Sequence, residues 1–424
     1  MRDKFFDRIE YMEKLGLLRK KHPQFIYKNY SWMFKGNSLK IAFDFRVYPD
    51  IRFKPEIIIK NVPKARLKKI GERAINNFVF HLGLIEIPSY WKATCSPEII
   101  IEAGYLNKEQ LKWWHDLIIN GLGQFFYENK IDFRKPDLLE IKCRSSLLKS
   151  DFNNLLKSDF NNRYLVPFAG GRDSIVTLEK LKGQKKEMAL FLVNPNEQIK
   201  KTAKASGVKK QIVVERKIDP SLLQLNKKGY LNGHTPFTAL LSFLSVFCAV
   251  LFDHRNVVFS NEKSADEGNV RYLGRVINHQ WAKSSEFEKR FRFYCRKYLA
   301  EKVNYLNFLR KYGELEISKM FARYPKYFPV FSSCNAAMKI KSSVKSRWCG
   351  KCPKCLFVYL TLCPYLKKKE ILKIFGEDLL KKQNLLPVLK SLIGKGRHKP
   401  FECVGTYAEA RKALNLCLKS LKKN

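Results

Sequence analysis

The chain has 424 residues, of which 45% are hydrophobic and 13% aromatic, a composition that excludes an intrinsically disordered protein and is sufficient for two or three packed domains. It carries 81 Lys and Arg against 39 Asp and Glu, a formal net charge of +42. Such an excess is typical of nucleic-acid partners, but the basic residues are scattered through every segment. We therefore favour a lysine-rich solvated surface and a polyanionic small-molecule substrate, and a nucleic-acid partner is unlikely without being excluded.

The first 16 residues alternate charged and apolar side chains and lack the uninterrupted apolar core of a secretory signal. The eleven cysteines then indicate a reducing compartment, where clustered thiols bind metals more often than they form disulfides. We expect a cytoplasmic protein in which isolated cysteines such as Cys248 and Cys417 belong to the core.

Residues 1–145 are expected to form an N-terminal α+β domain. Residues 41–47 and 55–59 have the composition of short strands, and residues 64–82 and 108–129 have helical periodicity. A linker follows over residues 146–162, where the octapeptide LLKSDFNN occurs twice in tandem. One duplication of eight residues does not make a repeat protein, so we expect an insertion in an exposed linker.

Residues 163–424 are expected to form an α/β catalytic domain. Short apolar strands are predicted at 164–168, 188–193, 211–214 and 256–260, with helices between them, a pattern typical of a doubly wound parallel sheet. Residues 235–252 carry no charge over 18 positions, the lower limit for crossing a bilayer. Pro236 suits a first helical position with Thr235 as its cap, so we predict a buried helix and no membrane insertion.

A glycine-rich turn joins the first of these strands to its helix. Its sequence is Ala169-Gly170-Gly171-Arg172-Asp173-Ser174. Two glycines allow a phosphate to approach the backbone, and the helix N-terminus offers free N–H groups and a positive dipole end. Ser174 adds a hydroxyl donor, and Asp173 can cap the helix or help to hold Mg²⁺. A plain strand-to-helix turn is the alternative.

Four cysteines have the spacing of a metal site. Cys349, Cys352 and Cys355 form a CxxCxxC motif, and Cys334 lies 15 positions earlier. Four thiolates suit a closed, tetrahedral structural zinc site. An iron–sulfur cluster and unligated thiols remain the alternatives.

Polar residues that follow the predicted strands are candidates for the chemistry. His234 precedes the buried helix and can contact ATP or transfer a proton, or simply bond the helix entry. Glu262 and Asn269 lie past the strand at 256–260, where substrate or Mg²⁺ is expected, with loop capping as the alternative. His279 and Lys283 are candidate acid–base or anion-binding groups, unless they belong to a solvated helix face.

The turn resembles the SGGxDS loop of the ATP pyrophosphatases (PP-loop enzymes), which cradles pyrophosphate, although Ala169 replaces the usual serine and Arg172 stands where lysine is frequent. Neither the P-loop nor the dinucleotide-binding glycine motif is present. Further strings, taken together and in order, resemble the UDP-N-acetylmuramoyl-L-alanyl-L-glutamate epimerases of peptidoglycan synthesis. They include HLGLIE at 81–86, EAGYL at 102–106, GHTP at 233–236, NEKSA at 261–265 and KPFECVG at 399–405.

This resemblance implies a PP-loop α/β fold and an ATP- and Mg²⁺-dependent inversion. The terminal L-Glu of UDP-MurNAc-L-Ala-L-Glu would become D-Glu while ATP becomes AMP and pyrophosphate, and a downstream peptidoglycan ligase would use the product. Residues 169–174 would bind ATP, and Asp173, Ser174, His234, Glu262, His279 and Lys283 would form the catalytic set. Adenylation is chemically reasonable, because it neutralises the carboxylate and makes the α-hydrogen more acidic.

Two other classes of protein remain open. The charge favours a tRNA- or nucleobase-modifying PP-loop enzyme that adenylates its substrate, although no RNA-binding module is recognisable. A zinc-stabilised nucleic-acid binder with an inactive loop is the third possibility, which the intact Gly170, Gly171, Asp173 and Ser174 disfavour.

Overall fold

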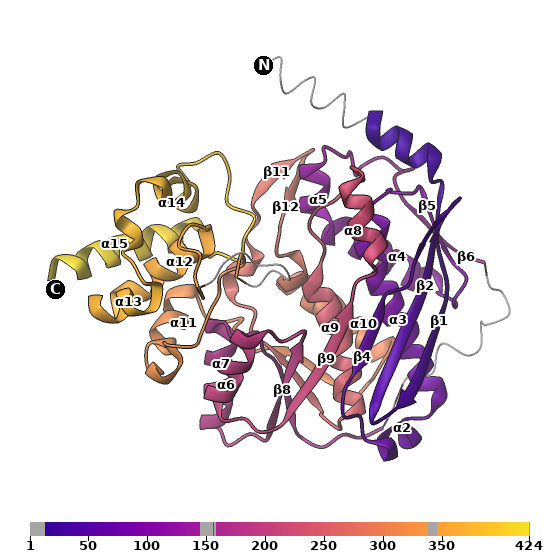
Figure 1. Cartoon of the computed structure of the whole chain (residues 1–424), viewed down its shortest axis with the longest axis horizontal. Coiled ribbons are helices and arrows are strands. Elements are labelled where there is room, and N and C mark those ends of the chain that lie inside the picture. The colour runs from indigo at the N-terminus through magenta and orange to yellow at the C-terminus, as the bar shows by residue number, and fades with distance from the viewer. Residues whose placement is uncertain (1–12, 145–155, 157, 338–345, 424) are drawn as a thin grey trace.

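The computed structural model describes residues 13–144, 156, 158–337 and 346–423. Within these residues a single eleven-stranded sheet runs through the molecule in the order β13-β10-β7-β8-β9-β4-β2-β1-β5-β6, with β3 paired to β2 (Figure 1). The sheet is mixed but mostly parallel. This confirms an α/β protein with a large, mostly parallel sheet.

The parallel part that carries the site contains β7 to β10 and β13. Their bounds are Tyr164–Pro167 (β7), Met188–Val193 (β8), Gln211–Lys217 (β9), Asn256–Phe259 (β10) and Asn304–Asn307 (β13). Each short apolar strand has neighbours on both faces: Leu165 faces one hydrophobic core and Val166 faces the other. Helices therefore cover both faces, as the predicted strand–helix alternation requires.

The two faces carry different helices. On one side lie α6 (Arg172–Gly183) and α7 (Glu197–Ser206), and on the other α9 (Phe237–Leu251) and α10 (Ser285–Tyr298). The predicted buried helix is α9, in which most side chains are buried, although it begins after Pro236 and lacks the expected Thr235 cap. Among the described residues, no helix combines the length and apolar character that a bilayer crossing would require.

The N-terminal part contains more strands than the sequence indicated. Its strands are β1 (Gln24–Lys35), β2 (Ser38–Val47), β3 (Ile51–Phe53), β4 (Glu56–Ile59), β5 (Glu98–Ile101) and β6 (Glu140–Cys143). The helix predicted at 64–82 is two helices, α2 (Lys64–Ile70) and α3 (Glu72–Trp91), separated by Gly71 at φ 81°. The helix predicted at 108–129 is likewise divided at Leu122 into α4 (Lys108–Gly121) and α5 (Gly123–Glu128).

One antiparallel pair joins the N-terminal strands to the parallel part. Strand β4 pairs with β9 over Glu56–Lys217 to Ile59–Val214. The main sheet therefore contains strands from both sides of the domain boundary that we expected near residue 145. In the second LLKSDFNN copy, Leu156 and Phe160 are buried, so this copy packs against the core and is not simply exposed. The first copy lies outside the described residues.

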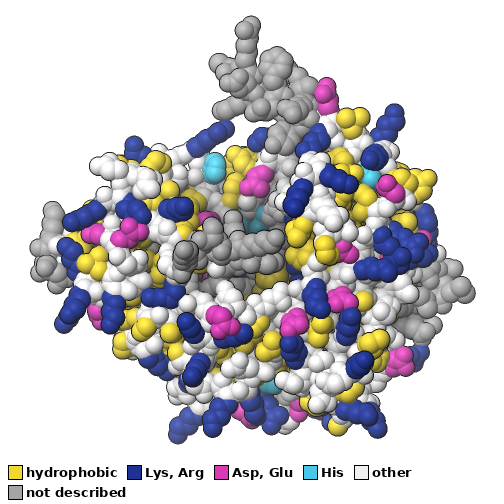
Figure 2. Space-filling model, viewed as in Figure 1, with side chains coloured by type: hydrophobic (Ala, Val, Ile, Leu, Met, Phe, Trp, Pro, Cys, Tyr) yellow, Lys and Arg dark blue, Asp and Glu magenta, His cyan; other side chains and the backbone are white. Residues whose placement is uncertain are grey.

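The C-terminal helices form a lobe beside α6. They are α11 (Glu314–Phe321), α12 (Pro353–Leu362), α13 (Lys368–Phe375), α14 (Leu386–Leu392) and α15 (Tyr407–Lys423), which lie together in the orange-to-yellow part of Figure 1. Cys417 is in the core as expected, but it forms a disulfide with Cys363, which the expectation of reduced thiols did not include. On the face shown in Figure 2, Lys and Arg are spread over most of the surface.

Candidate active site at the carboxyl ends of the parallel strands

The glycine turn follows β7 and begins helix α6. Gly170 has φ 72°, a left-handed value that favours glycine, and a Cβ there would lie 3.1 Å from the Thr202 side chain. Gly171 is the N-cap, and the Arg172 backbone N–H donates to Ser333 Oγ at 3.4 Å. The Ser174 hydroxyl donates to the Gly171 carbonyl at 2.9 Å. The turn is thus a compact helix N-terminus, an arrangement that favours anions.

The Arg172 side chain does not belong to the pocket, although its position in the turn suggested cofactor binding. It is 1% exposed and points into the C-terminal lobe, where it pairs with buried Glu314. It also donates to Ser318 Oγ at 2.8 Å and Thr361 Oγ1 at 3.0 Å. Burial alone would lower the pKa of Arg172, but Glu314 and Asp173 raise it above its ordinary value, so the guanidinium is charged. The Arg172 side chain is therefore directed away from the pocket.

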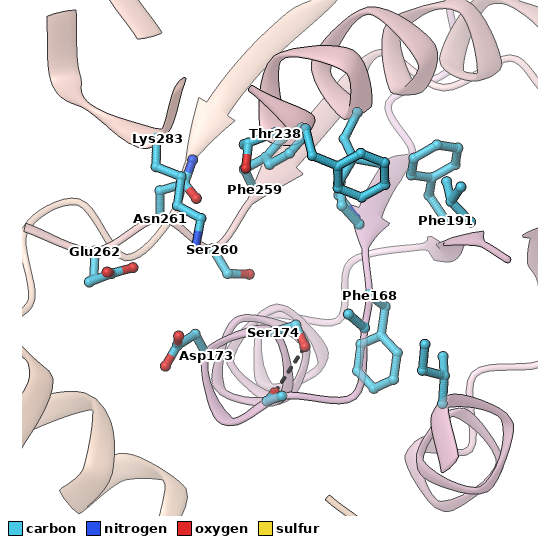
Figure 3. A pocket seen from close by; sticks show the side chains of 17 residues that line it. Phe168, Asp173, Ser174, Phe191, Thr238, Phe259, Ser260, Asn261, Glu262 and Lys283 are labelled. Atoms are coloured by element: carbon cyan, nitrogen blue, oxygen red, sulfur yellow. Dashed lines mark hydrogen bonds between the residues drawn. The ribbon is translucent and has the colours of Figure 1, made fainter. Parts of the chain in front are cut away.

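A pocket of about 250 Å³ opens beside the turn, where β7, β8 and β10 end (Figure 3). Apolar side chains form one part of it, among them Phe168, Phe191 and Phe237. The polar part combines the turn with residues after β10 and one lysine: Ala169, Gly171, Asp173, Ser174, Ser260, Asn261, Glu262 and Lys283. Of the predicted site residues, Asp173, Ser174, Glu262 and Lys283 are therefore brought together.

The charges of this polar part are well defined. Burial acts to raise the pKa of Asp173, but Arg172 and Lys354 outweigh it and lower the pKa, so this residue is a carboxylate. Burial acts to lower the pKa of Lys283, but Cys403 and Glu262 raise it above its ordinary value, so this residue is an ammonium. Arg310 fixes the backbone here, donating to the carbonyls of Glu262 at 2.9 Å and Lys283 at 2.6 Å. The pocket therefore presents acidic and basic groups together.

Two buried polar atoms in the pocket wall lack a hydrogen-bond partner among the described residues. They are Ser260 Oγ and Asn261 Nδ2, and Asn261 is only 6% exposed. Both residues line the pocket, but these two atoms are themselves buried within its wall. A buried polar atom without a partner is costly to the folded state.

The two predicted histidines form a pair outside the residues that line this pocket. The rings of His234 and His279 lie 4.4 Å apart between centroids, and His279 Nδ1 is 2.5 Å from Gln124 Oε1. Burial lowers the pKa of His234 to about 3, and burial with the charge of Lys283 lowers that of His279 to about 4. Both imidazoles are therefore neutral at pH 7. Asn269 caps this loop, accepting from the His279 N–H at 2.8 Å.

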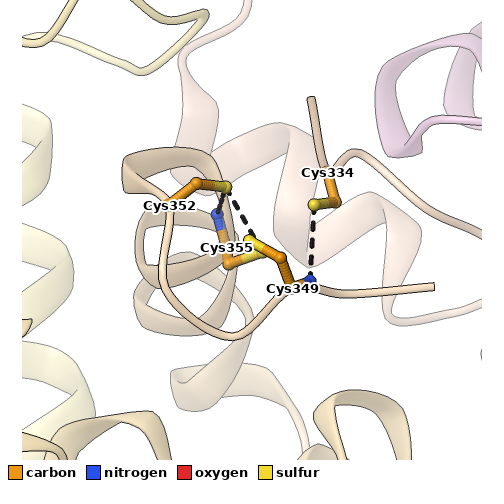
Figure 4. A group of neighbouring side chains, drawn as sticks. All are labelled: Cys334, Cys349, Cys352 and Cys355. Atoms are coloured by element: carbon orange, nitrogen blue, oxygen red, sulfur yellow. Dashed lines mark hydrogen bonds between the residues drawn. The ribbon is translucent and has the colours of Figure 1, made fainter. Parts of the chain in front are cut away.

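The four predicted metal ligands are brought together in the C-terminal lobe (Figure 4). The Sγ atoms of Cys334, Cys349, Cys352 and Cys355 all lie within 4.8 Å of one another. The backbone N–H groups of Cys349 and Cys355 point at Cys334 Sγ and Cys352 Sγ, at 3.4 Å each. Four mutually close thiols with N–H···S bonds fit a tetrahedral metal such as Zn²⁺.

Sequence reasoning missed three residues around the pocket, Lys92, Lys354 and Cys403. Lys92 is buried and donates to the Gly233 carbonyl, beside His234. Lys354 lies within the cysteine motif and donates to the Cys403 carbonyl, while Lys283 Nζ is 3.0 Å from Cys403 Sγ. All three occur in strings that resemble the epimerase family, but none was singled out as a site residue, because single lysines and cysteines have no diagnostic spacing.

These features define a class: an α/β protein with a glycine turn and a pocket at the carboxyl ends of its parallel strands, beside a lobe that contains a four-cysteine cluster. Family models named MurL N-terminal domain and MurL C-terminal domain match residues 18–308 and 330–423. The chain therefore belongs to the MurL family.

Relatives named UDP-N-acetyl-alpha-D-muramoyl-L-alanyl-L-glutamate epimerase align over most of the chain. The protein from a Micromonospora species is 37% identical over 77% of this chain and 72% of its own length. That from Salinispora tropica is 37% identical over 77% and 70%, and that from Xanthomonas oryzae pv. oryzae 34% identical over 78% and 72%. The resemblance inferred from short strings is thereby confirmed.

Proposed function

We propose that this protein is an ATP-dependent epimerase that inverts the terminal L-Glu of UDP-MurNAc-L-Ala-L-Glu, through an acyl-adenylate, in peptidoglycan precursor synthesis. The family and the names of its relatives support the epimerase activity. The observation that carries the adenylation step is the pocket, which places a glycine turn and helix N-terminus opposite Glu262 and Lys283. We place the fold in the PP-loop class on the same ground.

The turn and the helix N-terminus suit the phosphates of ATP. The backbone N–H groups at the start of α6 would hold the departing pyrophosphate, where the helix dipole stabilises negative charge. Phe168, Phe191 and Phe237 offer an apolar wall for the adenine. Mg²⁺ would neutralise phosphate charge, and the carboxylates of Asp173 and Glu262 fit it as hard oxygen ligands in the same pocket.

Adenylation prepares the glutamyl residue for inversion. The α-hydrogen next to a carboxylate is only weakly acidic, because its removal would create a second negative charge on the same group. A mixed anhydride with AMP carries no such charge, so a base can remove the proton and an acid can return one to the opposite face. Water then releases AMP and the D-Glu product, which a peptidoglycan ligase would use. Lys283 would stabilise the enolate electrostatically.

The cysteine cluster has a separate role in this proposal. A zinc ion held by Cys334, Cys349, Cys352 and Cys355 would cross-link the C-terminal lobe, with no open position for a substrate. Ser333, next to Cys334, contacts the glycine turn, and Lys354 lies between Cys352 and Cys355. Zinc would therefore brace the pocket structurally. The enzyme and its substrate would be cytoplasmic.

The decisive experiment is incubation with ATP, Mg²⁺ and UDP-MurNAc-L-Ala-L-Glu in heavy water, followed by chiral analysis of the glutamate. We expect D-Glu with deuterium at Cα, and AMP release that requires the dipeptide. Omission of ATP is the control, and we expect it to stop both. AMP release that is stimulated by tRNA instead, with glutamate left in the L configuration, would favour a tRNA-modifying enzyme and exclude this proposal.

A further inference from the structure

A short segment of the C-terminal region, residues 399–404, is held at several points against the loops after β10 and the cysteine lobe; we call it the strap. Lys399 forms an ion pair with Glu267 at 3.3 Å, and the Pro400 carbonyl accepts from Asn269 Nδ2 at 2.7 Å. Lys354 then holds the strap at two further points. Its backbone N–H donates to Glu402 Oε2 at 2.9 Å, and its ammonium donates to the Cys403 carbonyl. The strap is therefore fixed both to the loops after β10 and to the cysteine lobe.

The strap brings one thiol next to Lys283, which lines the polar side of the pocket. Cys403 is neither in the disulfide nor in the four-cysteine cluster. Its Sγ accepts a hydrogen bond from Lys283 Nζ at 3.0 Å, and Lys283 lines the pocket with Asp173 and Glu262. The thiol is consequently one hydrogen bond away from a group that a bound substrate would contact. The hydrogen bond from the Lys283 ammonium therefore fixes the position of the Cys403 sulfur.

Asn261 belongs to the same wall of the pocket. It lies next to Glu262 and is buried, and its Nδ2 is without a partner among the described residues. Asn261 and Lys283 both line the pocket. The Lys283 ammonium would stabilise the activated carbonyl of a glutamyl residue bound there.

We propose that Cys403 is a catalytic base of this enzyme and that Lys283 orients its sulfur through the Nζ···Sγ hydrogen bond, an inference that rests on the proposed epimerase function. In the step, the Cα–H bond of the adenylated glutamyl residue breaks and a proton moves to Cys403 Sγ, forming the thiol. The electron pair of that bond passes into the carbonyl as an enolate, beside the Lys283 ammonium. A proton that comes ultimately from solvent water reaches the opposite face of Cα, and Cys403 returns its own proton to solvent.

The test separates adenylation from proton transfer. Dipeptide-dependent exchange of pyrophosphate into ATP reports adenylation, and deuterium incorporation with chiral analysis reports the α-carbon steps. Cys403→Ala should retain pyrophosphate exchange within about threefold while epimerisation falls by about 10²–10⁴-fold. Cys403→Ser keeps the shape but is a much weaker base, so it should fall with Cys403→Ala. Cys143→Ser, at a half-buried thiol on β6, is the matched control and should behave as the unaltered enzyme.

Selective alkylation gives a second measurement on the unaltered chain. Iodoacetamide should label Cys403, as mapped by peptide mass spectrometry, and ATP with the dipeptide substrate should protect it while leaving Cys143 reactive. The inference is overturned if Cys403→Ala epimerises within about threefold of the unaltered enzyme. It is also overturned if pyrophosphate exchange and epimerisation fall together in Cys403→Ala, because Cys403 would then support the fold or adenylation. An unaltered enzyme without epimerisation would instead refute the proposed function itself.

Discussion

The stability of variants at the buried pair of Arg172 and Glu314 tests the structure. The sequence led us to expect Arg172 at the phosphate, whereas the structure pairs its side chain with buried Glu314. The Arg172 guanidinium is 1% exposed, and the Glu314 side chain is fully buried. Replacement of Arg172 by Met keeps the length of the side chain but leaves a carboxylate in the interior without its cation. Removal of one partner from such a pair costs about 3–5 kcal/mol. We expect Arg172→Met to lower the free energy of unfolding by this amount.

A double variant identifies the cause of that loss. Arg172→Met with Glu314→Leu removes both charges of this pair and leaves Asp173, the other carboxylate beside Arg172, as in the single variant. A buried pair replaced by apolar side chains is often tolerated. The double variant should therefore be more stable than Arg172→Met, with a coupling energy of about 2 kcal/mol or more. Arg134→Met is the control: it removes a surface arginine, 53% exposed, that pairs with Asp132, and should cause no measurable shift.

The assay is urea unfolding followed by circular dichroism, with the stability change taken from the shift in midpoint at a common slope. A loss below about 1 kcal/mol for Arg172→Met would refute the reasoning, since it lies far below the cost of a stranded buried charge. The guanidinium would then be directed to solvent or to the nucleotide. A double variant no more stable than the single one would exclude Glu314 as the main partner.

Three further predictions concern the turn, the metal and pH. Ser174→Ala and Asp173→Asn should lower dipeptide-dependent AMP release by about 10²-fold or more with an unchanged circular dichroism spectrum, and normal turnover in both would contradict a role of this turn in adenylation. The native protein should contain about one zinc per chain, and Cys352→Ser or chelation should lower the melting temperature; elemental analysis that finds iron or no metal would exclude the zinc site. Burial lowers the pKa of His81 to about 4, so the unfolded state binds more protons between pH 4 and 6.5 and stability falls as pH drops through this window. The free energy of unfolding, measured with urea, should fall when the pH is lowered from 7 to 5. We expect His81→Gln to make this fall smaller by about 2 kcal/mol, whereas His115→Gln, at an exposed histidine, should leave the fall unchanged.

The sequence predicted best those features that depend on neighbouring residues. The strand, glycine turn and helix over 164–183 are encoded locally by apolar runs and Gly170–Gly171, and the four metal ligands by their spacing. The breaks between helices were harder to predict. The helical pattern of apolar residues continues across Gly71, although the helix itself ends there. Hydrophobic periodicity alone does not show whether such a glycine bends the chain.

Features that depend on distant residues could not be predicted in this way. The pairing of β4 with β9 joins segments more than 150 positions apart, and no local pattern specifies which strand edge meets which. The direction of the Arg172 side chain is set by Glu314, Ser318 and Thr361, all from the C-terminal lobe. The contact between Lys283 and Cys403 spans 120 positions. The catalytic role of this contact is a prediction that the Cys403 variants test, and the roles of His234 and His279 remain predictions.

The β4–β9 pair also bears on how this protein can be divided for study. A fragment that began at residue 163 would expose the whole outer edge of β9, including the backbone groups that now bond to β4. Open strand edges of this kind associate with one another, so such a fragment would tend to aggregate regardless of an intact glycine turn. A two-part reconstitution is better made by a cut near residue 325, where the chain leaves α11 and no strand of the main sheet is interrupted. The residues that line the pocket would then lie in the first half and the four-cysteine cluster in the second, and binding of one half to the other would be measurable as the recovery of pyrophosphate exchange.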